Sequence, residues 1–151
     1  MDREKLKELI LTMDSNLVLA DTAEYLTAEV KPEGLHAFCE KLKTHPEASF
    51  DYVFSLIGMD YGDTLGVIYY LESVKHRHQL VVKVKCADKE NPVLDTVCDI
   101  WRTAEFLERE VYDLLGISFT NHPDLRRIFL DDDWVGHPLR KDYTDNHIIV
   151  R

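Results

Sequence analysis

Two histidines near the end of the chain have neighbours of the kind that a metal site needs. His122 and His137 are each followed by proline, which holds the preceding residue in extended backbone. With Asp124 or Asp142, each imidazole could bind a metal ion, because imidazole and carboxylate groups are common protein ligands of zinc. Each histidine could instead donate a hydrogen bond that fixes an irregular stretch of chain, and this second role is the one we expect.

A second pair of histidines flanks Arg77 in a polar stretch of the sequence. His76 and His78 are two residues apart, so at the end of a strand their side chains would share a face and could bind a metal. The alternative is a solvated turn between two strands, and we favour it.

The segment from Thr103 to Gly116 has the period of a helix with two different faces. One apolar stripe should pack on a sheet, and it contains Ala104, Leu107, Val111, Leu114 and Leu115. Another face gathers Phe106, Arg109, Glu110 and Asp113. Residues four apart can touch, so Arg109 can pair with Asp113 and Phe106 with Glu110. Thr103 is expected to cap the helix, and Gly116 to end it in a left-handed conformation.

Beyond Gly116 the sequence loses any helical or strand period and predicts an extended arm. It supplies two basic pairs, Arg126-Arg127 and Arg140-Lys141, which could reach the carboxylates of the acidic helix. Four aromatic residues recur along it: Phe119, Phe129, Trp134 and Tyr143. Aromatic residues and arginine are enriched at protein interfaces, so these side chains either fold back onto the domain or contact another protein.

Other patterns that carry chemistry do not occur in this sequence. It has no glycine-rich phosphate loop, GxSxG or HExxH motif. Cys39, Cys86 and Cys98 are too widely spaced for a cluster or zinc site of their own, and we expect buried, apolar roles for them. The net charge of -10 argues against a general nucleic-acid partner, which would need a basic surface. No apolar run is long enough to span a bilayer.

The elements that must position these residues can be read from hydrophobic periods. One helix is expected at residues 3–12. Another is opened by Lys31-Pro32-Glu33-Gly34, has Leu35, Phe38, Cys39 and Leu42 on one face, and ends before Pro46. A short helix is expected from Pro92 to about Ile100. Strands are expected at 25–30, 50–59, 65–73 and 80–86, the last two as an antiparallel hairpin. These elements predict an α+β class: a two-layer domain over residues 1–116 with a mixed, largely antiparallel sheet packed by helices, and an extended, irregular C-terminal arm over 117–151.

Two blocks in the charged helix and the arm resemble a known family. The run from Glu108 to Ile128, EREVYDLLGISFTNHPDLRRI, looks like the signature of the 30 kDa, or C-type, subunit of respiratory NADH dehydrogenase (complex I). The run from Asp132 to Tyr143, DDWVGHPLRKDY, is similar to that family's second block. The sequence departs from the family pattern at four positions that affect only local turns: Arg102, Phe106, Asn121 and Asp131.

This resemblance implies a non-catalytic subunit in the peripheral arm of a proton-pumping NADH:quinone oxidoreductase. FMN, iron–sulfur clusters and quinone would then lie in partner subunits, and this chain would bind no cofactor or metal. The implied partners are the 49 kDa (D-type) subunit, which forms the quinone cavity, and the B-type subunit, which carries the terminal cluster. The implied location is peripheral, on the cytoplasmic side of an energy-transducing membrane.

By the same resemblance, the matching residues have structural and docking roles and none is catalytic. They are Glu108, Arg109, Glu110, Asp113, Gly116, His122, Pro123, Arg126, Arg127, Trp134, His137, Pro138, Arg140, Lys141, Asp142 and Tyr143.

Three alternatives stay open. The same module occurs in related membrane-bound hydrogenases and ferredoxin-linked reductases, although the HPLRKDY run favours the quinone-linked branch. The chain could also be an independent small metalloenzyme that uses His122 and His137, or a free-standing binding module.

Overall fold

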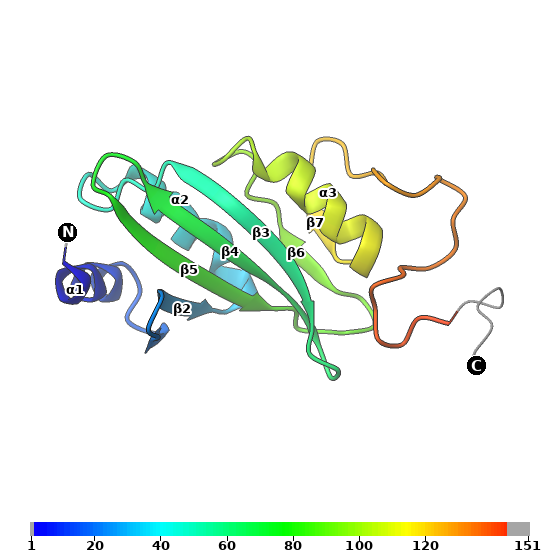
Figure 1. Ribbon diagram of the computed structural model, residues 1–151, viewed down its shortest axis with the longest axis horizontal. Helices are drawn as coiled ribbons and strands as arrows, with labels where there is room; N and C mark the ends of the chain where they lie inside the picture. Colours follow the sequence, from blue (N-terminus) through cyan, green and yellow to red (C-terminus); the bar gives the residue numbers. More distant parts are fainter. Residues whose placement is uncertain (1, 145–151) are drawn as a thin grey trace.

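A five-stranded sheet with helices on one face forms the centre of the molecule (Figure 1). The computed structural model describes residues 2–144. The strands are β1 (Val18–Asp21), β2 (Leu26–Val30), β3 (Tyr52–Asp60), β4 (Leu65–Ser73) and β5 (His78–Lys85), in the order β1-β2-β5-β4-β3. All neighbours are antiparallel except β2 and β5, which are parallel. The predicted α+β class, its mixed sheet and its hairpin are confirmed.

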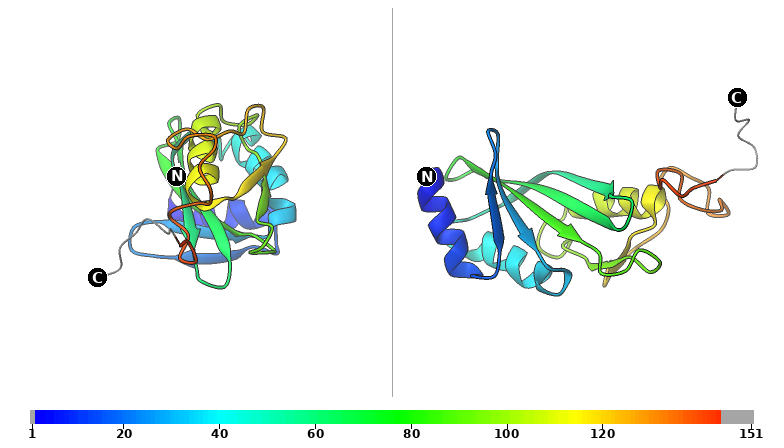
Figure 2. Two further views of the ribbon diagram at one scale, coloured as in Figure 1. Left: turned by 90° about the vertical axis from the view of Figure 1, so that its right-hand side faces the viewer. Right: turned by 90° about the horizontal axis from the view of Figure 1, so that it is seen from below.

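Helices α1 (Arg3–Met13) and α2 (Leu35–Thr44) cover one face of this sheet. Each is amphipathic, and Ile10 of α1 and Phe38 of α2 enter the core as the helical period predicts. A short 3-10 helix, η1 (Pro32–Gly34), precedes α2. The second view in Figure 2 shows both helices on the same side, with the opposite face of the sheet bare of helices.

Strand alternation decides which side chains meet the helices. In β5, Leu80, Val82 and Val84 are fully buried in the core, whereas Lys85 faces the other way and its ammonium lies 4.8 Å from the ring of Tyr61. This alternation is what a sheet with one wet face requires.

The prediction of a helix from Pro92 to Ile100 is wrong. Val93–Asp95 forms a short strand, β6, which pairs in parallel with β7 (Ser118–Thr120). Proline is compatible with a first helical turn, but here the residues that follow find backbone partners in a strand distant in sequence. The turn that leads into the next helix also excludes the expected cap, since Thr103 is itself helical (φ -61°, ψ -23°) and its side chain makes no capping bond.

Helix α3 (Ala104–Leu115) carries the charged motif and lies beside β3 (Figure 1). Gly116 ends it at φ 78°, as expected. β7 follows at once, so Ile117 and Phe119 are buried in the core although the arm was expected to begin at residue 117. Residues 121–144 contain no helix or strand. The division into a domain of residues 1–116 and an arm of 117–151 stays a prediction, and residues 145–151 lie outside the described part.

Candidate functional site

The carboxylate of Asp113 lies at the centre of the contact between α3 and the arm. Its side chain is completely buried. Oδ1 accepts a hydrogen bond from Arg127 Nη1 at 2.8 Å, and Oδ2 accepts three from backbone N–H groups of consecutive residues. Those donors are Ile128 (3.2 Å), Phe129 (2.8 Å) and Leu130 (3.1 Å). Burial raises the pKa of Asp113, but the bonds from Arg127 and the backbone outweigh it, and the net pKa is lowered.

Arg127 ties the arm to the end of α3 and to itself. Besides the carboxylate, Nη1 donates to the carbonyl oxygen of Asp113 at 3.0 Å. Nη2 donates to the carbonyl oxygens of Trp134 (2.9 Å) and Gly136 (2.8 Å). A planar guanidinium can serve these four acceptors at once, because its N–H groups are held in a fixed fork. The expected link between an arm arginine and the acidic helix is therefore present.

Arg109 does not make the ion pair with Asp113 that the helical spacing suggested. Its Nε and Nη2 donate to the carbonyl oxygens of Arg126 and Arg127, both at 3.1 Å. Its guanidinium carbon also lies 5.8 Å from the ring centre of Phe106. The backbone carbonyls of the arm compete successfully because the arm folds over this face of the helix.

The proline-flanked histidines act as backbone anchors. His122 Nε2 donates to the carbonyl oxygen of Glu105 at 3.0 Å, and its Nδ1 accepts from the backbone N–H of Asp124. His137 Nδ1 donates to the carbonyl oxygen of Asp113 at 2.9 Å. The hydrogen-bonding role expected for both is confirmed. Within residues 2–144 no group of three or more His, Cys, Asp or Glu side chains could hold a metal ion.

His76 lies in the turn at residues 74–77, where Val74, Lys75 and Arg77 are exposed, as expected, whereas His78 is a buried residue of β5. Both imidazoles also bond to backbone. Nε2 of His76 donates to the carbonyl oxygen of Pro46 at 2.9 Å, and Nε2 of the buried His78 donates to that of Ala48 at 2.8 Å. Their rings stack 5.6 Å apart. Burial lowers the pKa of His78 despite the bond to Ala48.

Glu108 is the motif residue whose environment the sequence did not reveal. Its side chain is fully buried, and both oxygens accept from the hydroxyl of Thr96 at 2.8 Å. Oε1 also accepts from the backbone N–H of Val97 at 3.0 Å. Burial raises its pKa to about 7, although these bonds act in the opposite direction. One signal was available: Glu108 lies between Ala104 and Val111 on the apolar stripe of the helix.

The remaining motif residues have weaker or peripheral contacts. Arg126 pairs with Asp124, and Arg140 with Asp142, in ion pairs of 3.0 Å at the surface. The backbone N–H of Lys141 donates to Asp60 at 2.8 Å, which fastens the arm to the β3–β4 turn.

Three more residues of the motif lie along the arm: the exposed Pro123, the half-buried Pro138, and Tyr143, whose ring lies against Gly136. Glu110 lies apart from this network, in the groove between α3 and β3.

The inward bonds leave apolar side chains on the outside of the arm. Phe129 is 64% exposed, Trp134 40%, Val135 87% and Leu139 61%. On α3, Phe106 is 59% exposed. Three of these side chains, Phe106, Phe129 and Trp134, are aromatic, and aromatic residues are enriched at protein interfaces.

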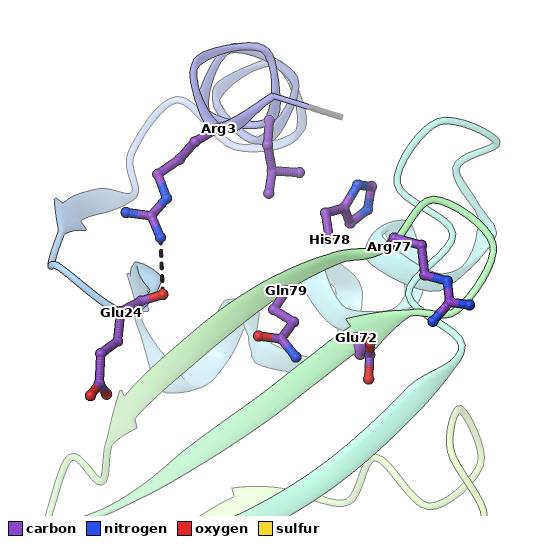
Figure 3. Close-up of a pocket in the computed structure, with 7 residues that line it drawn as sticks. Arg3, Glu24, Glu72, Arg77, His78 and Gln79 are labelled. Carbon is purple, nitrogen blue, oxygen red and sulfur yellow. Dashed lines mark hydrogen bonds between the residues drawn. The ribbon is translucent and has the colours of Figure 1, made fainter.

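A separate hollow lies at the opposite end of the sheet and is drawn in Figure 3. It measures about 420 Å³ and is lined by Arg3, Leu6, Glu24, Glu72, Arg77, His78 and Gln79. At one side of the hollow, Arg3 of α1 donates to the carbonyl oxygen of Glu24 at 2.9 Å, and it also pairs with Asp21 at 2.8 Å. These bonds attach α1 to the β1–β2 turn, which explains the arginine without a ligand.

Residues 28–147 match the family model described as "Respiratory-chain NADH dehydrogenase, 30 Kd subunit". The chain belongs to this family. One curated relative is the C/D-type subunit of NADH-quinone oxidoreductase from Phocaeicola vulgatus. It is 50% identical to this chain over 78% of the chain and 22% of that protein. Another is the C-type subunit of NADH-quinone oxidoreductase from Chloroherpeton thalassium, 41% identical over 93% of the chain and 57% of that protein. The chain thus spans about a fifth of the first and little more than half of the second.

A solved structure shows that the fold is shared more widely than the sequence. One chain of the membrane-bound sulfane sulfur reductase, an archaeal respiratory membrane complex, superimposes with a TM-score of 0.81. The match covers 93% of this chain and 85% of that chain at 22% identity. No helix within residues 2–144 has the length and apolar character needed to cross a membrane.

Proposed function

We propose that this chain is a cofactor-free structural subunit of the peripheral arm of a proton-pumping NADH:quinone oxidoreductase, where it supports the quinone-binding module. The observation that carries the proposal is the relative named as a combined C/D subunit, in which the matching region is 22% of a longer polypeptide. A part fused covalently to a D-type subunit has that subunit as its neighbour, so the D-type subunit is the first partner we expect. The B-type subunit is the second.

The geometry of the arm is consistent with such a role. Its arginines and histidines bond to backbone carbonyls and to Asp113, so they hold a shape instead of facing a substrate. The apolar side chains that point outward, above all Phe129 and Trp134, are of the types that dominate binding energy at interfaces. FMN, iron–sulfur clusters and quinone are assigned to the partner subunits, and the complex to the cytoplasmic side of the membrane.

We infer the electron donor from the relatives and not from the site. The relatives at 41–50% identity are named NADH-quinone oxidoreductase subunits. The sulfane sulfur reductase chain, at 22% identity, has the same fold, and the fold alone does not distinguish its branch from the NADH-linked one. The higher identity favours NADH and quinone.

Co-expression with the D-type and B-type subunits of the same organism tests the proposal. We expect a stable ternary complex on size exclusion, with Trp134→Ala weakening association about 10-fold or more, as loss of a buried aromatic anchor does. Val18→Ala, which removes an even more exposed apolar side chain from β1, is the control and should have no effect. Absence of a complex with the unmodified chain, or NADH oxidation by the chain alone, would refute the proposal.

A further inference from the structure

The outer edge of β3 has few of the features that protect edge strands: its pairing with β4 shifts register once, between Val53 and Ser55, and is regular from Ser55 to Asp60. β3 is the last strand of the five-stranded sheet, and within residues 2–144 it pairs only with β4. Its sequence, YVFSLIGMD, contains no proline, lysine or arginine, which are the residues that commonly prevent an edge from pairing with another chain. The opposite edge, β1, is only four residues long and ends in the ion-paired Asp21.

A groove of about 310 Å³ lies between this edge and α3. Four consecutive residues, Ser55 to Gly58, form one wall, and because successive strand residues point to opposite faces, a wall of this kind runs along the strand's edge. Leu107, Leu114 and other apolar residues of α3 form the second wall. Leu139 of the arm closes one end, where its backbone N–H donates to the carbonyl oxygen of Leu114 at 2.9 Å.

Gly58 keeps the two walls close together. A methyl group at that position would lie 2.4 Å from Leu115 Cδ1 and 3.0 Å from Val111 Cγ1, so α3 can approach β3 only because the side chain is absent. The groove is therefore fixed by close contact between the strand backbone and the helix.

Glu110 provides the charge of the groove. Its carboxylate lines a mostly apolar surface, in which Ser55 is the one other polar side chain, and no hydrogen bond or ion pair joins Glu110 to another side chain in the part of the chain that the structure describes. Glu108 and Asp113, the two acidic motif residues that share α3 with it, both accept hydrogen bonds from within the chain. The groove thus has one carboxylate available to a basic group from outside.

We propose that this groove receives an extended segment of a neighbouring subunit, which lies along the edge of β3. Its backbone would bond to the outward-facing amides of Ser55 to Gly58, an aliphatic side chain would fill the space beside Leu107 and Leu114, and a lysine or arginine nearby would pair with Glu110. An extended segment is favoured because a strand edge supplies backbone donors and acceptors in register, which is how such edges recognise peptides. The proposal rests on the proposed function, since it needs an assembled complex.

Site-specific photo-crosslinking in the assembled complex of this chain with its D-type and B-type partners tests it. Benzoylphenylalanine replaces Ile57, which is 43% exposed at the groove, and in parallel Trp134 in the arm and Val18 on β1. We expect position 57 to crosslink to a peptide of a partner subunit that has a lysine or arginine within three residues of an aliphatic side chain, and position 18 to give no crosslink. A crosslink from position 134 with none from position 57 would refute the proposal that the groove binds a partner segment, while leaving the proposed function intact. A crosslink from 57 to a second copy of this chain would also overturn it.

Charge reversal gives an independent measurement. Glu110→Lys should lower co-purification of the partner about 10-fold without moving the thermal unfolding midpoint of the free chain, and exchange of the crosslinked partner residue for glutamate should restore it. Glu8→Lys, which alters an exposed glutamate of α1, is the matched control. Equal co-purification of both variants with the partner would count against the ion pair and the proposal.

Discussion

At the scale of single residues, Glu108 makes folding sensitive to pH. Its pKa rises from the ordinary 4.5 to about 7 because the carboxylate is buried. A raised pKa means that the folded protein holds the proton more tightly than the unfolded chain, so this group favours folding most at low pH. Its contribution declines as pH rises from about 4.5 to about 7 and is fully lost above that.

Glu108→Gln is expected to remove this dependence. Glutamine keeps the shape and an acceptor oxygen for Thr96 and Val97 but carries no charge. A difference of about 2.5 pH units corresponds to roughly 3 kcal/mol, so the variant should gain stability relative to the natural chain by up to this amount between pH 5 and 8. Urea unfolding at several pH values measures it, with Glu8→Gln as control. Parallel pH profiles for the natural chain and Glu108→Gln would contradict the assignment.

Gly116 illustrates how one atom can matter at a helix end. Its φ of 78° already disfavours a side chain, and a methyl group there would lie 2.6 Å from Cδ2 of His137. Gly116→Ala should therefore cost about 1–2 kcal/mol for the backbone and roughly 1 kcal/mol more for the displaced histidine bond. Gly62→Ala is the matched control, because Gly62 has φ 92° but nothing within 4 Å. If thermal unfolding shows the same loss of stability for Gly116→Ala and Gly62→Ala, then His137 moves away from the added methyl group without an energetic cost.

At the scale of elements, α3 and the arm depend on each other through Asp113 and Arg127. Arg127→Lys keeps the charge but replaces a fork that serves four acceptors with a single ammonium group. We expect the amides of Ile128 to Leu130 to lose protection from hydrogen exchange by about 10-fold or more, while the amides of β4 keep theirs. Arg126→Lys, whose side chain is exposed in a surface ion pair, is the control and should change neither. Uniform loss across the sheet would mean that the arm and the core unfold together.

The sequence predicts long elements well and short ones poorly. Helices α1, α2 and α3 and strands β3 to β5 contain several periods of their hydrophobic pattern, so their positions follow from local sequence. Strands β6 and β7 have three residues each, which is too few to show any period, and each exists because the other lies beside it. The same limit explains Arg109: its spacing from Asp113 was right for an ion pair, but the carbonyls it prefers belong to the arm.

At the scale of the whole molecule, the two faces of the sheet differ in what covers them. One face holds the core with α1 and α2, whereas the opposite face carries no helix within residues 2–144 (Figures 1 and 2). The edge of β3 and the arm are the surfaces that we propose for contact with other subunits. The motif residues could be recognised in the sequence, but their division into inward and outward sets could not, because it depends on how the arm crosses α3. Glu108 and Asp113 are buried, while Glu110 and Trp134 line the groove or face outward.

The three thiols have one more consequence. Burial raises the pKa of all three thiols, that of Cys86 to about 11, but Cys39 and Cys86 are buried whereas Cys98 is partly exposed. The thiolate is the nucleophile that attacks an alkylating reagent, so Cys98 should react first, and Cys39 and Cys86 only when the interior opens. Mass spectrometry at successive times would measure how often the interior opens, from the rate at which the two buried thiols are alkylated. The measurement can be made on the chain alone and then on the assembled complex.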